Sequence, residues 1–144
     1  MTENHREEVV EIQLSSSTKL LYSLRTLTRT LAESMGYGTK ESENTALAVE
    51  EAVSNVIEHG YHGEPRHRIR IRFEMEGKKF VVRIMHSGDH LDISHVPSGD
   101  LANFYKQKKK GGLGIVIMRK FMDEVSYKSG SRQNECCMVK YLKK

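Results

Sequence analysis

The sequence predicts an α+β fold of two layers, in which a mixed or antiparallel sheet is covered on one face by about three helices. Three observations support this fold class. Segments in which apolar and polar residues alternate are interspersed with segments in which apolar residues recur every three or four positions. Two pairs of alternating segments are separated only by short turns, which is typical of antiparallel hairpins. The order strand, helix, helix, hairpin, loop, helix, hairpin fits one layer of strands and one of helices.

The first half of the chain is expected to form one strand and two helices. Residues 8–14 (EVVEIQL) alternate and end at serines, as a strand does. From Thr18 onward leucines recur at threes and fours, until the glycines of residues 36–38 end the helix. A second helix is expected over about residues 40–59, with Gly60 as its left-handed cap. Its apolar stripe comprises Ala46, Leu47, Val49, Ala52, Val53, Val56 and Ile57.

The second half is expected to form two hairpins separated by a long loop and a helix. Residues 67–87 alternate on both sides of a turn at Gly77, with arginines on one face of the first strand. An irregular stretch follows over residues 88–110. A third helix begins after the letters GGLG and runs roughly to Met122. Residues 124–142 then return as a second hairpin, which turns between Ser129 and Asn134.

Composition favours a single soluble domain over residues 1–144 and excludes several classes of protein. The chain is 38% hydrophobic and 29% charged, which is ordinary for a globular protein. No apolar run approaches the roughly 20 residues of a membrane span, and the polar start is unlike a signal peptide, so we expect a cytoplasmic protein without a membrane partner. The two cysteines, Cys136 and Cys137, are neighbours, which suits neither a disulfide framework nor a metal site.

The net charge of +4 does not by itself indicate nucleic-acid binding. The basic residues are scattered, and no stripe of arginine and lysine is interleaved with stacking aromatic residues. We therefore expect no nucleic-acid partner.

The polar pair Glu51 and Asn55 is the first candidate for chemistry. The two residues are four positions apart, so they share one face of the second helix, beside its apolar stripe. The simpler alternative is a solvated face on an amphipathic helix, and the pair alone does not exclude it.

The long loop and the glycines that end it form the second candidate. About 20 residues without regular structure exceed the usual length of a loop in a compact domain, and such loops are often lids. Gly112, Leu113 and Gly114 open the third helix, where free backbone amides can receive phosphate. The alternative is that these glycines only mark the end of a loop. The spacings of a P-loop and of a dinucleotide fingerprint are both absent.

Two motifs together resemble the ATP-binding domain of the GHKL superfamily, and more narrowly the anti-sigma-factor serine kinases. The letters LAVEEAVSNVIEHGY resemble the N-box of that family, and GGLGIVIMRKFMDEV resembles its second glycine box. The resemblance extends from about Val9 to Leu142 and implies the Bergerat-type ATP-binding fold.

The resemblance implies a role for each candidate residue. Asn55 would bind a Mg²⁺ ion that also holds the ATP phosphates, since oxygen ligands suit that ion. Glu51 would orient and deprotonate a serine hydroxyl of a protein substrate. Gly112, Leu113 and Gly114 would contact the phosphates, with a lysine of residues 106–110 as a further contact that the sequence does not single out.

The sequence departs from the family at the first glycine box. Where the family has an aspartate that accepts a hydrogen bond from adenine, this chain has His86, followed by Ser87 and Gly88. Strand alternation places His86 on the same side as the apolar residues of its strand, so we expect it to face the nucleotide pocket together with Gly88. A metal site formed by His86, His90 and His95 is the less favoured alternative, because no second-shell pattern accompanies these histidines.

Three functions follow from these observations. The first is an anti-sigma factor and ATP-dependent serine kinase whose substrate is an antagonist protein of the STAS type. The second is a partner-binding module that keeps the fold but binds ATP weakly or not at all. The third, a detached histidine-kinase domain, lacks a dimerisation helix with a phosphoacceptor. By the same resemblance, a sigma factor, the antagonist and a second copy of the chain are the expected partners, and ATP and Mg²⁺ are the expected cofactors.

Overall fold

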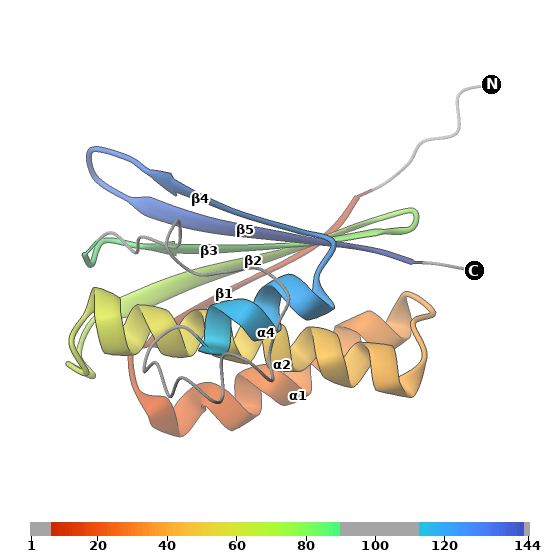
Figure 1. Ribbon diagram of the computed structural model, residues 1–144, viewed down its shortest axis with the longest axis horizontal. Coiled ribbons are helices and arrows are strands. Elements are labelled where there is room, and N and C mark those ends of the chain that lie inside the picture. The colour runs from red at the N-terminus through yellow and green to blue at the C-terminus, as the bar shows by residue number, and fades with distance from the viewer. Residues whose placement is uncertain (1–6, 90–112, 143–144) are drawn as a thin grey trace.

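The computed structural model describes residues 7–89 and 113–142, which form one antiparallel sheet with helices on one of its faces (Figure 1). The strands of this part of the chain lie in the order β1-β2-β3-β5-β4, and every neighbouring pair is antiparallel. The strand bounds are β1 Glu8–Ser15, β2 Arg68–Glu76, β3 Lys79–His86, β4 Glu124–Ser129 and β5 Asn134–Tyr141. The expected α+β fold class is confirmed.

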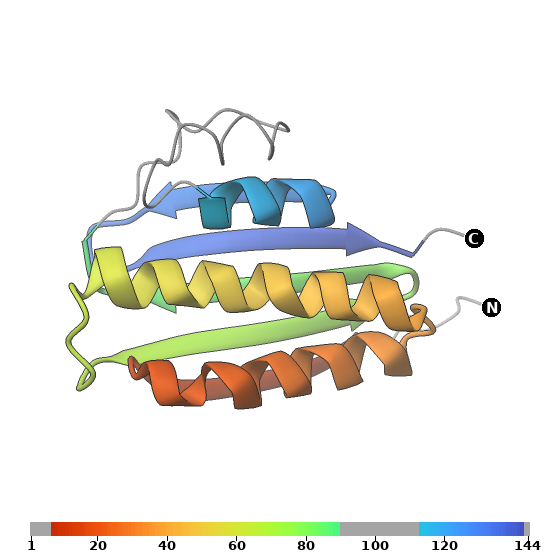
Figure 2. The same ribbon diagram turned by 60° about the horizontal axis from the view of Figure 1, so that its bottom comes forward.

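The helices pack side by side against the sheet, with α2 between α1 and α4 (Figure 2). A 3-10 turn over Thr18–Leu20 leads into α1 (Leu21–Ser34), and Ser17 caps the turn by accepting a hydrogen bond from the amide of Lys19. Helix α2 runs over Thr39–Asn55, and α4 over Leu113–Phe121. In the described part of the chain, no helix is both long and apolar enough to cross a membrane.

The core lies between the sheet and the helices, as the alternation in the sequence predicts. In β2 the residues Ile69, Ile71 and Phe73 are fully buried, whereas the intervening arginines lie on the open face. The ring of Phe73 stacks on that of Phe80 from β3, at a centroid distance of 6.1 Å. Helix α2 meets this layer through small residues such as Ala52, which let its backbone come close to the sheet. Helix α4 packs on the side of α2 that is opposite α1.

The end of α2 differs from the expectation. The chain does not stop at Gly60 with a left-handed cap but passes through a π-helical turn over Val56–Gly60. The left-handed residues are His62, with a φ of 53°, and Gly63, with a φ of 79°. The wider π turn delays the reversal of the chain by two residues, so Gly60 stays free to pack against another segment. Single π turns inside helices are frequent at functional sites.

Candidate nucleotide site

Glu51 and Asn55 lie against the first turn of α4, at Gly114. A methyl group added to Gly114 would lie 2.8 Å from Glu51 Oε2, 3.3 Å from Asn55 Nδ2 and 3.4 Å from Asn55 Oδ1. Glycine at this position therefore keeps open the space that the two polar side chains share. Leu113 is the first residue of α4, whereas Gly112 lies outside the described residues, as do the lysines of residues 106–110. The structure thus brings Glu51, Asn55 and Gly114 together.

The carboxylate of Glu51 is half-buried and has no cationic partner or hydrogen-bond donor within the described residues. Its neighbour Glu50 is paired instead, with Arg25 at 3.5 Å. Burial raises the pKa of Glu51, and the nearby carboxylates of Glu50 and Glu58 raise it further. A carboxylate of raised pKa that no cation neutralises is a better proton acceptor near neutral pH than an ordinary one. A carboxyl group whose pKa is shifted by burial and by neighbouring charges is a typical catalytic candidate.

The carboxamide of Asn55 is buried, with 6% of the residue exposed. Its nitrogen makes one weak contact, at 4.0 Å, to the sulfur of Met118 in α4. Its oxygen accepts no hydrogen bond from residues 7–89 or 113–142. A carboxamide oxygen that lies beside a carboxylate suits a hard cation such as Mg²⁺, which prefers oxygen ligands.

His86 ends β3 on the buried side, with 3% of the residue exposed. It faces the same layer as Phe80 and Ile84, as strand alternation predicts. Its Nδ1 atom accepts a hydrogen bond from the amide of Gly88, at 3.2 Å. A neutral imidazole has one acceptor and one donor nitrogen, so this ring carries its proton on Nε2. Nε2 is therefore a hydrogen-bond donor, whereas both oxygens of an aspartate are acceptors.

The turn at Gly88 is fastened to the π turn that follows Asn55. A methyl group on Gly88 would lie 2.4 Å from the carbonyl oxygen of Gly60, so only glycine fits. The same carbonyl accepts a hydrogen bond from the amide of Asp89 at 2.8 Å. On the other side, Asn134 Nδ2 donates to the carbonyl oxygen of Gly88 at 2.8 Å. The end of β3 and the end of α2 therefore form one rigid corner of the site.

Some residues of this corner were not found from the sequence. The hydroxyl of Tyr61 accepts a hydrogen bond from the amide of Ser87 at 2.8 Å, and its ring meets that of His86 edge-on. The structure shows that Asn134 is a buried polar residue at the first position of β5. In the sequence it has the residue type of an ordinary turn. Met118 gave no signal, since an apolar residue in a helix stripe ordinarily belongs to the core.

The alternative histidine metal site gains no support here. His90 and His95 lie outside the described residues, so their positions relative to His86 are not defined. Among the residues that the structure describes, no group of three or more histidine, cysteine, aspartate or glutamate side chains could hold a metal ion. Asp89 pairs with His62, whose Nε2 lies 2.6 Å from Asp89 Oδ2.

Comparisons with known proteins place this geometry in a family. Serine-protein kinase RsbW of Bacillus velezensis is 28% identical over 140 residues, which are 94% of this chain and 86% of that protein. RsbW of Staphylococcus aureus is 27% identical, over 96% of this chain and 90% of its own length. A crystal structure of the RsbU and RsbW domains of a Mycobacterium tuberculosis protein superposes with a TM-score of 0.66. It covers 94% of this chain and 32% of that one, at 14% identity, and so supports the fold alone.

The family itself is identified by a match over most of the chain. Residues 14–140 match the family described as the histidine kinase-like ATPase domain. This range includes the helix with Glu51 and Asn55, the corner at His86 and the helix that begins at Leu113. The resemblance inferred from the two sequence motifs is confirmed, and the chain belongs to the histidine kinase-like ATPase domain family.

Proposed function

We propose that this protein is an anti-sigma factor and an ATP-dependent protein serine kinase, whose substrate is a serine of a STAS-type antagonist protein. The relatives named serine-protein kinase RsbW support the kinase class. The observation that carries the proposal is the convergence on Gly114 of the Asn55 carboxamide and of the Glu51 carboxylate, which has no cationic partner among the described residues. A solvated helix face would not bury these groups against a glycine.

The residues of the site fit a magnesium-bound nucleotide. Asn55 would contribute its carboxamide oxygen to Mg²⁺, and the backbone amides of Gly112, Leu113 and Gly114 would receive phosphate oxygens. ATP supplies the phosphoryl group that is transferred. Phosphoryl transfer depends mainly on positioning and charge stabilisation, which suits a site built from amides and one amide oxygen.

Glu51 acts as the general base in this proposal. Its carboxylate would accept the proton of the substrate serine hydroxyl, while the serine oxygen bonds to the γ-phosphorus of ATP and the bond from that phosphorus to ADP breaks. The raised pKa of Glu51 makes this proton transfer more favourable than for an exposed glutamate. Because Glu51 Oε2 lies 2.8 Å from the position that a Cβ on Gly114 would take, the base lies near the amides that would receive the phosphates.

The proposal is tested by phosphoryl transfer to a purified STAS-domain protein from the same organism. We expect Mg-ATP to give phosphoserine on that protein, detected by mass spectrometry. We expect the Glu51→Gln variant to bind Mg-ATP with nearly unchanged affinity, while the rate of phosphoryl transfer falls by about a hundredfold or more. Transfer by the Glu51→Gln variant at the rate of the unaltered protein would refute the assigned base. Absence of Mg-ATP binding by calorimetry at about millimolar nucleotide would refute the kinase proposal.

A second candidate, a partner-binding module with weak or no ATP binding, is favoured by the state of His86. With Nδ1 occupied by Gly88, the ring offers an N–H where the family has an acceptor for the adenine amino group. A donor on the ring cannot pair with the adenine amino group, and the lost hydrogen bond would cost the nucleotide about 1–3 kcal/mol, or roughly tenfold to a hundredfold in affinity.

The variant His86→Asp separates the two candidates. If the pocket has decayed, the aspartate restores an acceptor, and calorimetry gives at least a tenfold gain in ATP affinity. If the histidine is the working residue of a kinase, affinity falls instead. His67→Asp is a suitable control, because the ring of His67 stacks on Tyr61 and His67 does not correspond to the family residue that binds adenine.

The remaining partners are part of the same proposal. We expect the protein to bind a sigma factor and to form a homodimer, as the family resemblance implies. Sedimentation of the purified chain, alone and with the sigma factor, tests both expectations. A monomer that does not bind any sigma factor of its organism would contradict them.

A further inference from the structure

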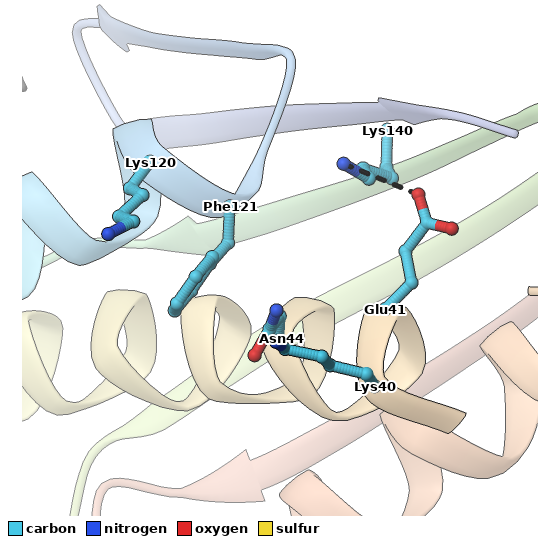
Figure 3. Close-up of a pocket in the computed structure, with 6 residues that line it drawn as sticks. All are labelled: Lys40, Glu41, Asn44, Lys120, Phe121 and Lys140. Carbon is cyan, nitrogen blue, oxygen red and sulfur yellow. Dashed lines mark ion pairs between the residues drawn. The ribbon is translucent and has the colours of Figure 1, made fainter. Parts of the chain in front are cut away.

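A second hollow lies at the opposite ends of α2 and α4 from the nucleotide site. Its volume is about 360 Å³, and Figure 3 shows the residues that line it: Lys40, Glu41 and Asn44 of α2, Lys120 and Phe121 of α4, and Lys140 of β5. Along α2, Asn44 precedes Glu51 by seven residues, which corresponds to about 10 Å of helix. A ligand in this hollow would therefore be distinct from one held by Glu51 and Asn55.

The charge of the hollow is positive. Lys140 is mostly buried, and its ammonium lies 3.5 Å from Glu41 Oε1 and 4.0 Å from Asp123 Oδ2. These two carboxylates therefore pair with Lys140. Lys40 and Lys120, by contrast, form no ion pair with the described residues. Within the described part of the chain, the rim thus carries two cations that no carboxylate neutralises, and such a positive surface attracts anionic groups.

The hollow also offers an amide and an aromatic ring. In Figure 3 the ring of Phe121 extends from α4 toward Asn44 on α2, and the side chain of Lys40 runs alongside Asn44. The carboxamide of Asn44 has no hydrogen-bond partner within the described part of the chain. A volume of about 360 Å³ corresponds to roughly ten water molecules, which is more than a bare inorganic anion fills. Peptide side chains match this mixture of charge, amide and ring better.

We propose that this hollow binds an acidic segment of a partner protein. Carboxylates of the segment pair with Lys40 and Lys120, Asn44 donates to one of them, and an adjacent apolar side chain packs on Phe121. This site is independent of nucleotide chemistry and adds a protein-binding surface to the proposed function.

The test measures fluorescence anisotropy of a fluorescein-labelled octapeptide of alternating glutamate and leucine, titrated with the full chain at low salt. We expect binding with a Kd below about 1 mM, and at least tenfold weaker binding of the same peptide with glutamine in place of glutamate. The double variant Lys40→Gln/Lys120→Gln should weaken binding of the acidic peptide at least tenfold. The near-isosteric variant Asn44→Asp should also weaken it, because it places a carboxylate in the hollow.

The matched control is Lys79→Gln/Lys128→Gln, which removes the same net charge from exposed strand positions. It should change the affinity less than twofold. An equal loss in both double variants would overturn the proposal, because the peptide would then respond only to net charge. It would also be overturned if the wild-type chain failed to bind the acidic peptide, or if inorganic phosphate at matched ionic strength displaced it, since the site would then be one for small anions.

Discussion

Replacing Gly114 by alanine tests whether the space in front of Glu51 and Asn55 is a binding cavity. The added methyl group would lie 2.8 Å from Glu51 Oε2 and within 3.4 Å of both polar atoms of Asn55. The closest of these atoms is the end of a flexible side chain, so the carboxylate can move aside. Alanine also favours a helix over glycine by up to about 1 kcal/mol. The melting temperature should therefore stay within about 3 °C of wild type.

Nucleotide affinity should respond quite differently to the same change. The methyl group would occupy the space that Glu51 and Asn55 share and displace the carboxylate, so we expect calorimetry to show Mg-ATP binding weakened at least tenfold, or about 1.4 kcal/mol. Gly38→Ala is the matched control, because it also lies at a helix start and has no atom within 4 Å of the added methyl. Adding Glu51→Ser to Gly114→Ala should restore part of the affinity. Unchanged Mg-ATP affinity in Gly114→Ala would refute the location of the site.

Three further variants test the energetics of the site. Because burial and two neighbouring carboxylates raise the pKa of Glu51, the folded chain binds that proton more tightly than the unfolded chain, and the stabilisation is lost as pH rises through the folded pKa. Glu51→Gln should therefore melt above wild type at pH 8, with the difference vanishing below the ordinary pKa of 4.5; a constant difference across pH would contradict this. Gly88→Ala should lower the free energy of unfolding by about 1–3 kcal/mol, because its methyl meets the carbonyl of Gly60, and an unchanged melting temperature would contradict the contact. Asn55→Leu should abolish Mg-ATP binding in calorimetry, because it removes the oxygen ligand, whereas Thr45→Val, which removes a hydroxyl bonded to the Glu41 carbonyl, should leave Mg-ATP affinity within about twofold of wild type; retained binding in Asn55→Leu would contradict the assigned role.

Periodicity predicted the elements well but not the details of their ends. In β2 the apolar residues of the alternating pattern are buried and the polar ones are not, because that strand has one covered and one open face. In β3 the pattern fails at Val81 and Met85, which are buried on the open face beneath neighbouring charged side chains. The π turn after Asn55 could not be predicted, since Gly60 has the residue type of a cap. Its conformation depends on the tertiary contact with Gly88.

The candidate site was predictable to the extent that it is local in the sequence. The spacing of Glu51 and Asn55 fixes a shared helix face, and the glycines before α4 indicate a close approach of the backbone. The contact of Gly114 with both side chains is tertiary, and only the family resemblance suggested it. The lysine-lined hollow gave no sequence signal, because Lys40 and Lys140 are 100 positions apart. No local pattern reports the approach of such distant residues.

The energetics of α2 bear on whether the site is functional. The helix contributes fully buried apolar residues to the core. At the edge of that core it places the Glu51 carboxylate, which has no partner among the described residues, and the Asn55 carboxamide, whose contact there is the weak one to the sulfur of Met118. A leucine at Asn55 and an alanine at Gly114 would instead fill, with apolar groups, the space that these side chains share. A chain that instead keeps a carboxylate and a carboxamide facing a glycine offers oxygen ligands beside the amides of a helix start, and a cation with bound phosphates would bind both.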